Sequence, residues 1–124
     1  MRASFDIDGV IFMGGYPGIF PGKDDIIVTG RSFEEYPETI AMLQSKGIFT
    51  IPYFSLLSFK KKTRRASGIH KGQVLRRLNE NGYNIGIHYE DDTIQAREIK
   101  KVVPNIEIVL LKHSLVEKEN KRYV

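Results

Sequence analysis

Two aspartates near the start of the chain, Asp6 and Asp8, have the type and spacing that most directly suggest chemistry. They come at the end of a short apolar run and are followed by Gly9. Residues two apart on a strand share a face, so the two carboxylates are expected to converge where the glycine lets the chain turn. Carboxylates this close repel each other unless a cation or a proton lies between them, and Mg²⁺ prefers oxygen ligands. A strand ending in an Asp-Gly turn is the structural alternative.

Two further groups of polar residues follow predicted strands. The first is Thr29, Gly30 and Arg31, with which the predicted strand 25–29 ends, and the second is Glu90, Asp91 and Asp92 after residues 85–89. In parallel sheets ligands bind beyond the carboxyl ends of the strands, so all three groups are expected at one edge. A carboxylate can attack phosphorus, acids can hold a metal ion, and a hydroxyl and an ammonium can hold phosphoryl oxygens. The coincidence favours a functional site over incidental loop polarity.

The pattern of apolar residues and breakers predicts strands that alternate with helices. The predicted strands are 3–8, 25–29, 48–54, 85–89 and 106–111, and the predicted helices are about 32–46, 69–81 and 93–103. Ser32 and Glu35 form a capping-box pattern at the first helix, and Pro52 indicates an edge strand. This alternation predicts an α/β fold with a mostly parallel sheet of about five strands and right-handed crossovers.

Two segments fall outside this alternation. Residues 10–22 contain too many glycines and prolines for a helix, and their apolar residues suggest a hairpin-like flap over the end of the first strand. Residues 55–68 are predicted to be a basic loop that includes Lys60, Lys61, Lys62, Arg64 and Arg65. Such a cluster can meet phosphates, and a solvated loop is the alternative. The polar tail 112–124 is expected to be a short helix or disordered.

Length and composition indicate one ordinary globular domain over residues 1–124. The chain is 41% apolar and 27% charged, with a net charge of +4 and a pI of about 9.3. Without cysteine it can form no disulfide and no zinc-thiolate site. No apolar run approaches the roughly 20 residues of a membrane span, and the N-terminus lacks the pattern of a secretory signal. We therefore expect a cytoplasmic protein with no membrane partner.

Taken in order, these residues resemble the haloacid dehalogenase-like (HAD) phosphohydrolases. The stretch 5–10 (FDIDGV) looks like their motif I and 26–30 (IIVTG) like motif II, Lys71 ahead of a helix fits motif III, and 85–92 fits motif IV. The resemblance covers residues 3–111. It implies a three-layer α/β/α Rossmann-like fold and a Mg²⁺-dependent phosphatase that works through an aspartyl-phosphate.

The resemblance also implies roles for individual residues. Asp6 would be the nucleophile, and Asp8 the general acid and then the general base. Thr29 would bind the phosphoryl group, and Lys71 would steady both the phosphate and Asp6. Mg²⁺ would be held by Asp6, by the backbone carbonyl of Asp8 and by Asp91, with Asp92 beside it.

Some assignments stay open at this point. Which of Glu90, Asp91 and Asp92 is the main metal ligand is undecided, since a slip of one residue on a strand reverses its faces; Asp91 is favoured because Glu90 is nearer to the strand and longer. Thr29-Gly30-Arg31 is similar to motif II of polynucleotide phosphatases, where the arginine would contact substrate phosphate. An arginine facing water is the alternative. His70 and His88 are expected to be structural.

The chain is shorter than the pattern that it resembles. Only about twenty residues separate the first two motifs, and about fifteen precede Lys71, so neither interval has room for a cap domain. We expect an open site, a large substrate such as a nucleotide or a nucleic-acid end, and a homodimer contact on the thinly covered face of the sheet. The alternatives are a catalytically inactive binding or regulatory module, and a nucleic-acid-binding protein that uses the basic loop 60–65.

Overall fold

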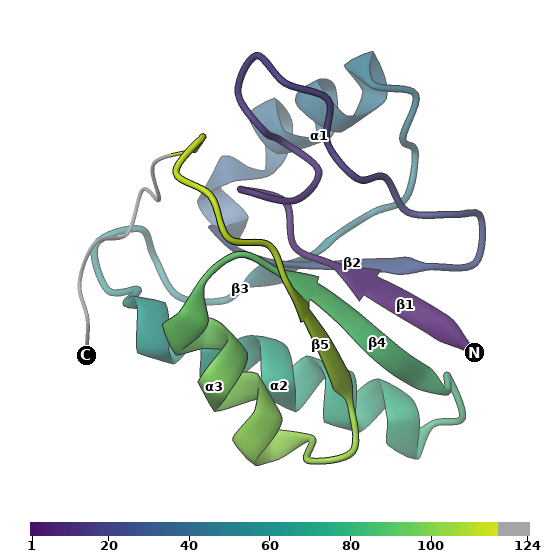
Figure 1. The fold of residues 1–124 in the computed structure, drawn as a ribbon. Coiled ribbons are helices and arrows are strands. Elements are labelled where there is room, and N and C mark those ends of the chain that lie inside the picture. The colour runs from purple at the N-terminus through teal and green to yellow at the C-terminus, as the bar shows by residue number, and fades with distance from the viewer. Residues whose placement is uncertain (117–124) are drawn as a thin grey trace.

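The computed structural model describes residues 1–116, which form a single sheet flanked by helices. The strands are β1 (Arg2–Phe5), β2 (Ile26–Ser32), β3 (Tyr53–Ser55), β4 (Ile85–Glu90) and β5 (Glu107–Leu110), and the helices are the 3₁₀ turn η1 (Phe33–Glu35), α1 (Tyr36–Ser45), α2 (Arg64–Glu80) and α3 (Thr93–Val102). Every strand pair is parallel, in the order β3-β2-β1-β4-β5 (Figure 1). The predicted Rossmann-like α/β class is therefore confirmed.

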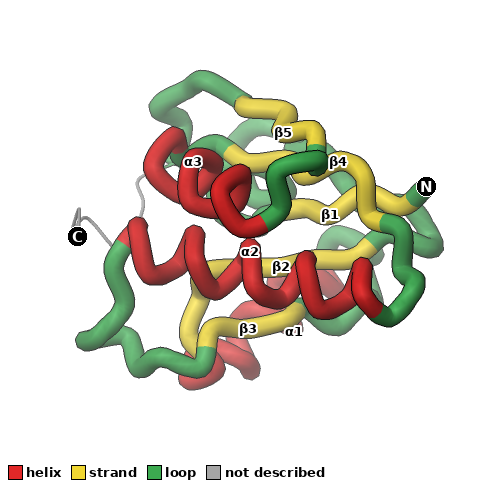
Figure 2. The backbone as a smooth tube through the Cα atoms, turned by 90° about the horizontal axis from the view of Figure 1, so that it is seen from below, coloured by secondary structure: helices red, strands yellow, loops and turns green. Residues whose placement is uncertain are grey.

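Helices cover both faces of the sheet. α1 and the connection between β1 and β2 lie on one face, and α2 and α3 lie side by side on the other (Figures 1 and 2). Each face has its own apolar core. The first core consists of Phe5, Ile7, Val10, Ile11, Ile27, Leu43 and Ile48, and the second of Ile26, Val28, Val74, Leu75, Ile85, Ile99 and Ile106. This arrangement is the predicted three-layer architecture.

The strand order creates a switch point between β1 and β4. From β1 the chain moves outward through β2 to β3, and it then returns to β4 and moves outward the other way to β5. Because parallel crossovers are right-handed, connections that run in opposite directions lie on opposite faces. The segments that leave β1 and β4 therefore diverge, and a crevice outside two such strand ends is where open α/β sheets bind ligands.

Two predicted boundaries in the middle of the chain were wrong. β3 contains only Tyr53–Ser55, not residues 48–54, although it is an edge strand, as Pro52 predicted. α2 begins at Arg64 rather than near residue 69, because the side chain of Thr63 caps it by accepting a hydrogen bond from Ala66 N. Residues 64–68, the end of the predicted basic loop, are therefore helical.

The end of β2 also differs from the prediction. This strand continues to Ser32, so Gly30 and Arg31 lie within it rather than after it. The capping box of Ser32 and Glu35 is present, but it caps η1, which leads into α1. The extra length carries β2 beyond the end of β1, since Phe5 pairs with Ile27.

The connection between β1 and β2 is a packed layer rather than a flap over the strand end. Val10 and Ile11 are fully buried in the core beneath α1, and Ile19 N donates a hydrogen bond to Val10 O. Gly18 lies so close to the backbone of Ile11 that a Cβ atom would overlap it. This segment covers the sheet where a crossover helix would otherwise lie, while Tyr16 stays exposed.

Two further expectations concern the tail and the membrane. Most of the tail, residues 117–124, lies outside the described residues. Among the helices of residues 1–116, none is long and apolar enough to cross a membrane.

Candidate active site

A buried lysine joins the ends of β1 and β4. Lys71 Nζ lies 3.1 Å from Asp6 Oδ1 and 2.8 Å from Glu90 Oε1, and all three side chains are almost completely buried. Asp6 N also donates a hydrogen bond to Tyr89 O, which aligns the two strand ends. The sequence predicted Lys71 at the start of a helix, but the residue lies in the interior of α2. Three elements thus converge at the switch point of the sheet.

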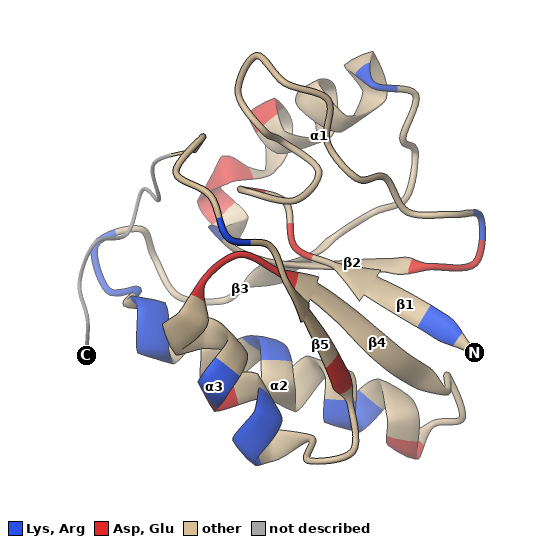
Figure 3. Cartoon of the chain, in the orientation of Figure 1, with Lys and Arg blue, Asp and Glu red and all other residues tan. Residues whose placement is uncertain are grey.

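Three carboxylates meet beside this lysine. Asp6, Glu90 and Asp91 each offer an oxygen atom, and these atoms lie within 4.8 Å of one another. The acidic segments after β1 and β4 accordingly lie side by side at one edge of the sheet (Figure 3). Three carboxylates and one ammonium leave a formal charge of −2, which a divalent cation would balance. Clustered carboxylate oxygens suit a hard ion such as Mg²⁺.

Gly9 brings the turn after β1 against Asp91. Its φ of +89° lies in the left-handed region that glycine tolerates. A Cβ atom at this position would overlap the carboxylate of Asp91. The sequence predicted the turn, and the structure adds this close approach between two segments that are far apart in the chain.

Asp92 has a different environment from Asp91. Its Oδ1 accepts hydrogen bonds from Ile94 N (2.9 Å) and Gln95 N (3.1 Å), which caps α3. Its Oδ2 lies 2.7 Å from Arg64 Nε. The structure therefore does not bring Asp92 into the group of three carboxylates, and Glu90 lies where Asp92 was expected.

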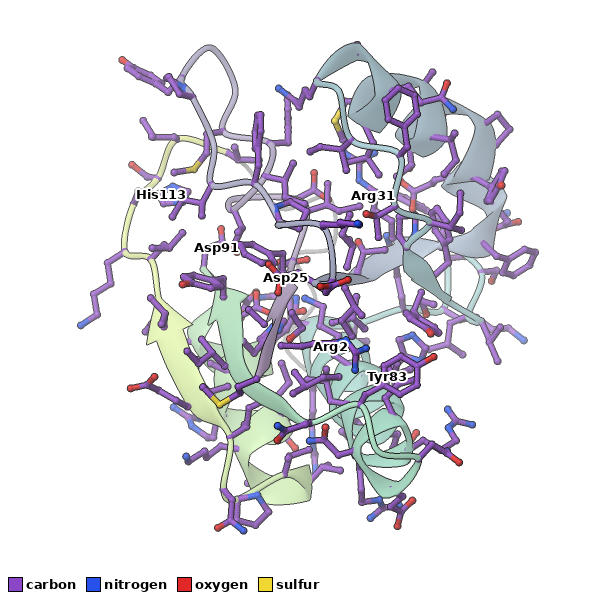
Figure 4. All side chains as sticks on the ribbon, turned by 90° about the vertical axis from the view of Figure 1, so that its right-hand side faces the viewer. Arg2, Asp25, Arg31, Tyr83, Asp91 and His113 are labelled. Atoms are coloured by element: carbon purple, nitrogen blue, oxygen red, sulfur yellow. The ribbon has the colours of Figure 1, made fainter. Side chains whose placement is uncertain are left out.

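Asp8 forms a two-bond ion pair with Arg31. Arg31 Nε donates to Asp8 Oδ2 at 2.8 Å and Nη2 donates to Oδ1 at 2.7 Å, while Nη1 donates to Thr39 Oγ1 at 3.0 Å. Both side chains of the pair are mostly buried. In the side-chain view, Arg31 and Asp91 lie toward the carboxyl ends of the strands, whereas Arg2 and Tyr83 lie toward the amino ends (Figure 4).

Thr29 and Gly30 shape the strand beneath Arg31. Thr29 is fully buried, and its Oγ1 accepts a hydrogen bond from Arg31 N at 3.0 Å. Gly30 lets α2 come close, because a Cβ atom there would lie 3.0 Å from Ser67 Oγ. In this structure Thr29 supports the position of Arg31, and Gly30 allows the close approach of α2 to β2.

The basic cluster is largely paired with acidic side chains. Lys62 is buried, and its Nζ lies 3.1 Å from Glu35 Oε2. Arg64 pairs with Asp92, and Arg65 Nε lies 3.8 Å from Glu98 Oε1. These cations join η1, α2 and α3 rather than forming one uncompensated patch.

The histidines expected to be structural have distinct surroundings. His88 is fully buried, with Nδ1 2.6 Å from Ser4 Oγ and Nε2 3.1 Å from Glu90 Oε1. Burial, and secondarily the charge of Lys71, lowers the pKa of His70 below its usual value. Sequence reasoning did not connect His88 to the site, although its two-residue spacing from Glu90 on one strand was an available signal.

His113, which follows β5, was missed altogether. Its Nε2 lies 2.8 Å from Gly9 O, and its Nδ1 accepts a hydrogen bond from Leu115 N at 3.1 Å. Figure 4 shows that His113, like Asp91, lies toward the carboxyl ends of the strands. No spacing pattern links residue 113 to residue 9, so only the tertiary fold could reveal this contact.

Comparison with protein-family models, with curated proteins and with solved structures gave no match for this chain. The structure itself has a Rossmann-like α/β fold with a parallel sheet of five strands.

Proposed function

We propose that this protein is a Mg²⁺-dependent phosphatase that hydrolyses a phosphate monoester through an aspartyl-phosphate on Asp6. The observation that carries the proposal is the buried ammonium of Lys71 between Asp6 and Glu90, with Asp91 beside them, at the switch point of the sheet. Such a site concentrates a nucleophilic carboxylate, a cation and metal ligands where α/β sheets bind ligands. The motif order that resembles the HAD phosphohydrolases supports the same chemistry.

The proposed reaction has two steps. A carboxylate oxygen of Asp6 attacks phosphorus, the bond from phosphorus to the leaving oxygen breaks, and Asp8 gives that oxygen a proton. Asp8 then takes a proton from water, whose oxygen attacks the aspartyl-phosphate, and inorganic phosphate leaves as Asp6 is regenerated. Lys71 would orient Asp6 and offset the charge of the phosphoryl oxygens. Mg²⁺ would offset more of this charge. Its ligands would be the carboxylates of Asp6 and Asp91 and the backbone carbonyl of Asp8.

The pair of Asp8 and Arg31 gives Arg31 a role in substrate binding. Asp8 accepts two hydrogen bonds from Arg31, so it would have to leave this pair and take up a proton from solvent before it acts as the general acid. An incoming phosphate offers a guanidinium another acceptor with the same two-bond geometry. Arg31, whose backbone amide donates to Thr29 Oγ1, is therefore proposed to bind the substrate phosphate and to release Asp8 as it does so.

The lack of a second folded unit over the carboxyl edge in residues 1–116 supports the proposed substrate class. A site without a cap suits a phosphate on a larger molecule, and a nucleotide or a nucleic-acid end is the class that we propose. Homodimer formation and a cytoplasmic location remain expectations from the sequence.

A metal-binding module without catalysis is the second candidate. The observation that favours it is the near-complete burial of Asp6, together with the ion pair that occupies Asp8. Turnover separates the two candidates: metal binding without hydrolysis across a panel of phosphate monoesters would favour the module. Binding of nucleic acid by the basic loop has less support, because Lys62 and Arg64 are paired with acids.

Substitution of the nucleophile tests the proposed reaction. Hydrolysis of p-nitrophenyl phosphate should require Mg²⁺ and should fall to background in Asp6→Asn, because an amide cannot form the acyl-phosphate. Asp8→Asn should lower kcat by about 10²- to 10⁴-fold, the usual contribution of a general acid–base. Asp24→Asn, an exposed aspartate just before β2, is the matched control and should keep full activity. Equal activity of wild type and Asp6→Asn would contradict the assignment.

A further inference from the structure

A row of buried polar side chains crosses from β1 to β4 beneath the proposed site. Ser4 and His88 are register partners on the two adjacent strands, and Ser4 Oγ lies 2.6 Å from His88 Nδ1. His88 Nε2 lies 3.1 Å from Glu90 Oε1, and the same oxygen lies 2.8 Å from Lys71 Nζ. Burying polar groups is costly unless they are hydrogen-bonded, so this row has a structural or functional reason to exist.

The carboxylate of Glu90 is fully occupied by donors. Its Oε1 accepts from Lys71 Nζ and His88 Nε2, and its Oε2 accepts from the backbone amides of Asp91 (3.2 Å) and Asp92 (3.3 Å). A carboxylate offers about four acceptor positions, and Glu90 is fully buried. A metal ion could bind Glu90 only by displacing one of these donors. Asp91 differs, since it is partly exposed beside the turn at Gly9.

We propose that Glu90 is a positioning residue that holds Lys71 against Asp6, that His88 holds Glu90 in turn, and that the cation is bound by the carboxylates of Asp6 and Asp91. This division of roles rests on the proposed function. It assigns the three clustered carboxylates to two tasks and gives the buried histidine a part in the site.

The ring of His88 suits this task. A carboxylate oxygen only accepts hydrogen bonds, so Nε2 carries the hydrogen in its contact with Glu90. Ser4 fixes the orientation of the ring from the opposite side. A partner that orients a functional carboxylate in this way typically changes metal affinity or activity by about 10- to 100-fold when it is removed.

Metal affinity separates the roles of Glu90 and Asp91. Mn²⁺, titrated into each protein and followed by electron paramagnetic resonance, serves as the probe. Asp91→Asn should bind Mn²⁺ at least about tenfold more weakly than wild type, as expected on loss of a ligand. Glu90→Gln should keep most of the affinity and lose kcat, because its amide disturbs the contact with Lys71. Equal loss of Mn²⁺ binding in the two variants would overturn the proposal.

A pair of His88 variants tests the same idea with Glu90 left intact. In His88→Gln the side-chain amide can still donate to Glu90, whereas His88→Met fills the space without a donor. His88→Met should lower kcat for p-nitrophenyl phosphate by about 10- to 100-fold with Mn²⁺ affinity and KM little changed, and His88→Gln should recover most of kcat. Equal kcat in the two variants would contradict the role of His88, and this pair decides the question if Glu90→Gln does not fold.

Failure of this inference can be told apart from failure of the proposed function. If wild type hydrolyses phosphate monoesters but Glu90→Gln and Asp91→Asn lose Mn²⁺ equally, only the division of roles is wrong. If wild type binds Mn²⁺ and hydrolyses nothing, the phosphatase proposal is wrong, while the metal titrations still test the ligands. If wild type binds no Mn²⁺, both proposals are contradicted.

Discussion

Lys71 is among the largest side chains that the structure buries completely in residues 1–116. A buried ammonium is unfavourable unless it is paired, and here Asp6 and Glu90 provide the pairing. The two carboxylates also depend on the lysine. Without it, Asp6 and Glu90 would be buried beside each other with like charges. Lys71 is thus expected to contribute to stability as well as to the proposed chemistry.

Removal of this charge should destabilise the fold. We expect Lys71→Met to lower the free energy of unfolding by about 3–5 kcal/mol, the usual loss when one partner of a buried ion pair is removed. Urea unfolding in EDTA measures the effect, and Mg²⁺ should restore part of it because a cation offsets the same carboxylates. Lys23→Met, at an exposed position, is the control. Unchanged stability of Lys71→Met would show that the two carboxylates do not need the lysine.

Gly9 offers a sharp test of the contact with Asp91. Gly9→Ala should weaken Mn²⁺ binding, because the new methyl group would displace the carboxylate of Asp91. Gly82→Ala is a matched control: Gly82 has a similar φ of +86°, and among the described residues no atom lies within 4 Å of its added Cβ. Both variants should lose about 1–2 kcal/mol of stability from left-handed backbone strain. Equal Mn²⁺ affinity in the two would contradict the proposed position of Asp91 as a ligand.

At the scale of elements, α2 packs closely on α3. Gly68 and Gly72 lie one turn apart on α2, and both face α3. A Cβ atom on Gly68 would lie 2.8 Å from the backbone Cα of Gln95, whereas one on Gly72 would lie 2.9 Å from the side chain of Val102. Side chains adjust more easily than backbone does, so the two positions should tolerate a methyl group differently.

Alanine at these two glycines tests the helix packing. We expect Gly68→Ala to destabilise the protein by about 1–3 kcal/mol through overpacking, despite the gain of about 1 kcal/mol in helix propensity. Gly72→Ala should cost less, and Gln73→Ala, at an exposed position of the same helix, should be nearly neutral. Thermal unfolding followed by circular dichroism measures the order. A larger loss for Gly72→Ala than for Gly68→Ala would contradict the close approach of Gly68 to the backbone of α3.

At the scale of the whole molecule, the strand order decides where chemistry can occur. The chain leaves β1 toward one face and β4 toward the other, so side chains after these two strands meet without a loop crossing over them. The connection between β1 and β2 contains no helix, and it packs Val10 and Ile11 on the same face of the sheet as α1. Residues 1–116 thereby cover both faces of the sheet, and no second folded unit among them lies over its carboxyl edge.

Local sequence patterns predicted the class of fold and the edge of the sheet that carries the polar residues. Alternating apolar runs and helix patterns are local signals, and so are the glycines and prolines that end them. Asp6, Asp8 and Asp91 could therefore be assigned to strand ends in advance. The start of α2 was misjudged because Thr63, the residue that caps it, lies inside a run of basic residues.

Which of these side chains pair with one another depends on the tertiary structure. Glu90 rather than Asp92 joins Asp6 and Asp91, because Asp92 caps α3 and pairs with Arg64. Asp8 faces Arg31 rather than the other acids, and His88 reaches the site through Glu90. These choices depend on strand register, helix position and burial, which bring together residues that are far apart in the chain, and local sequence patterns do not encode such contacts.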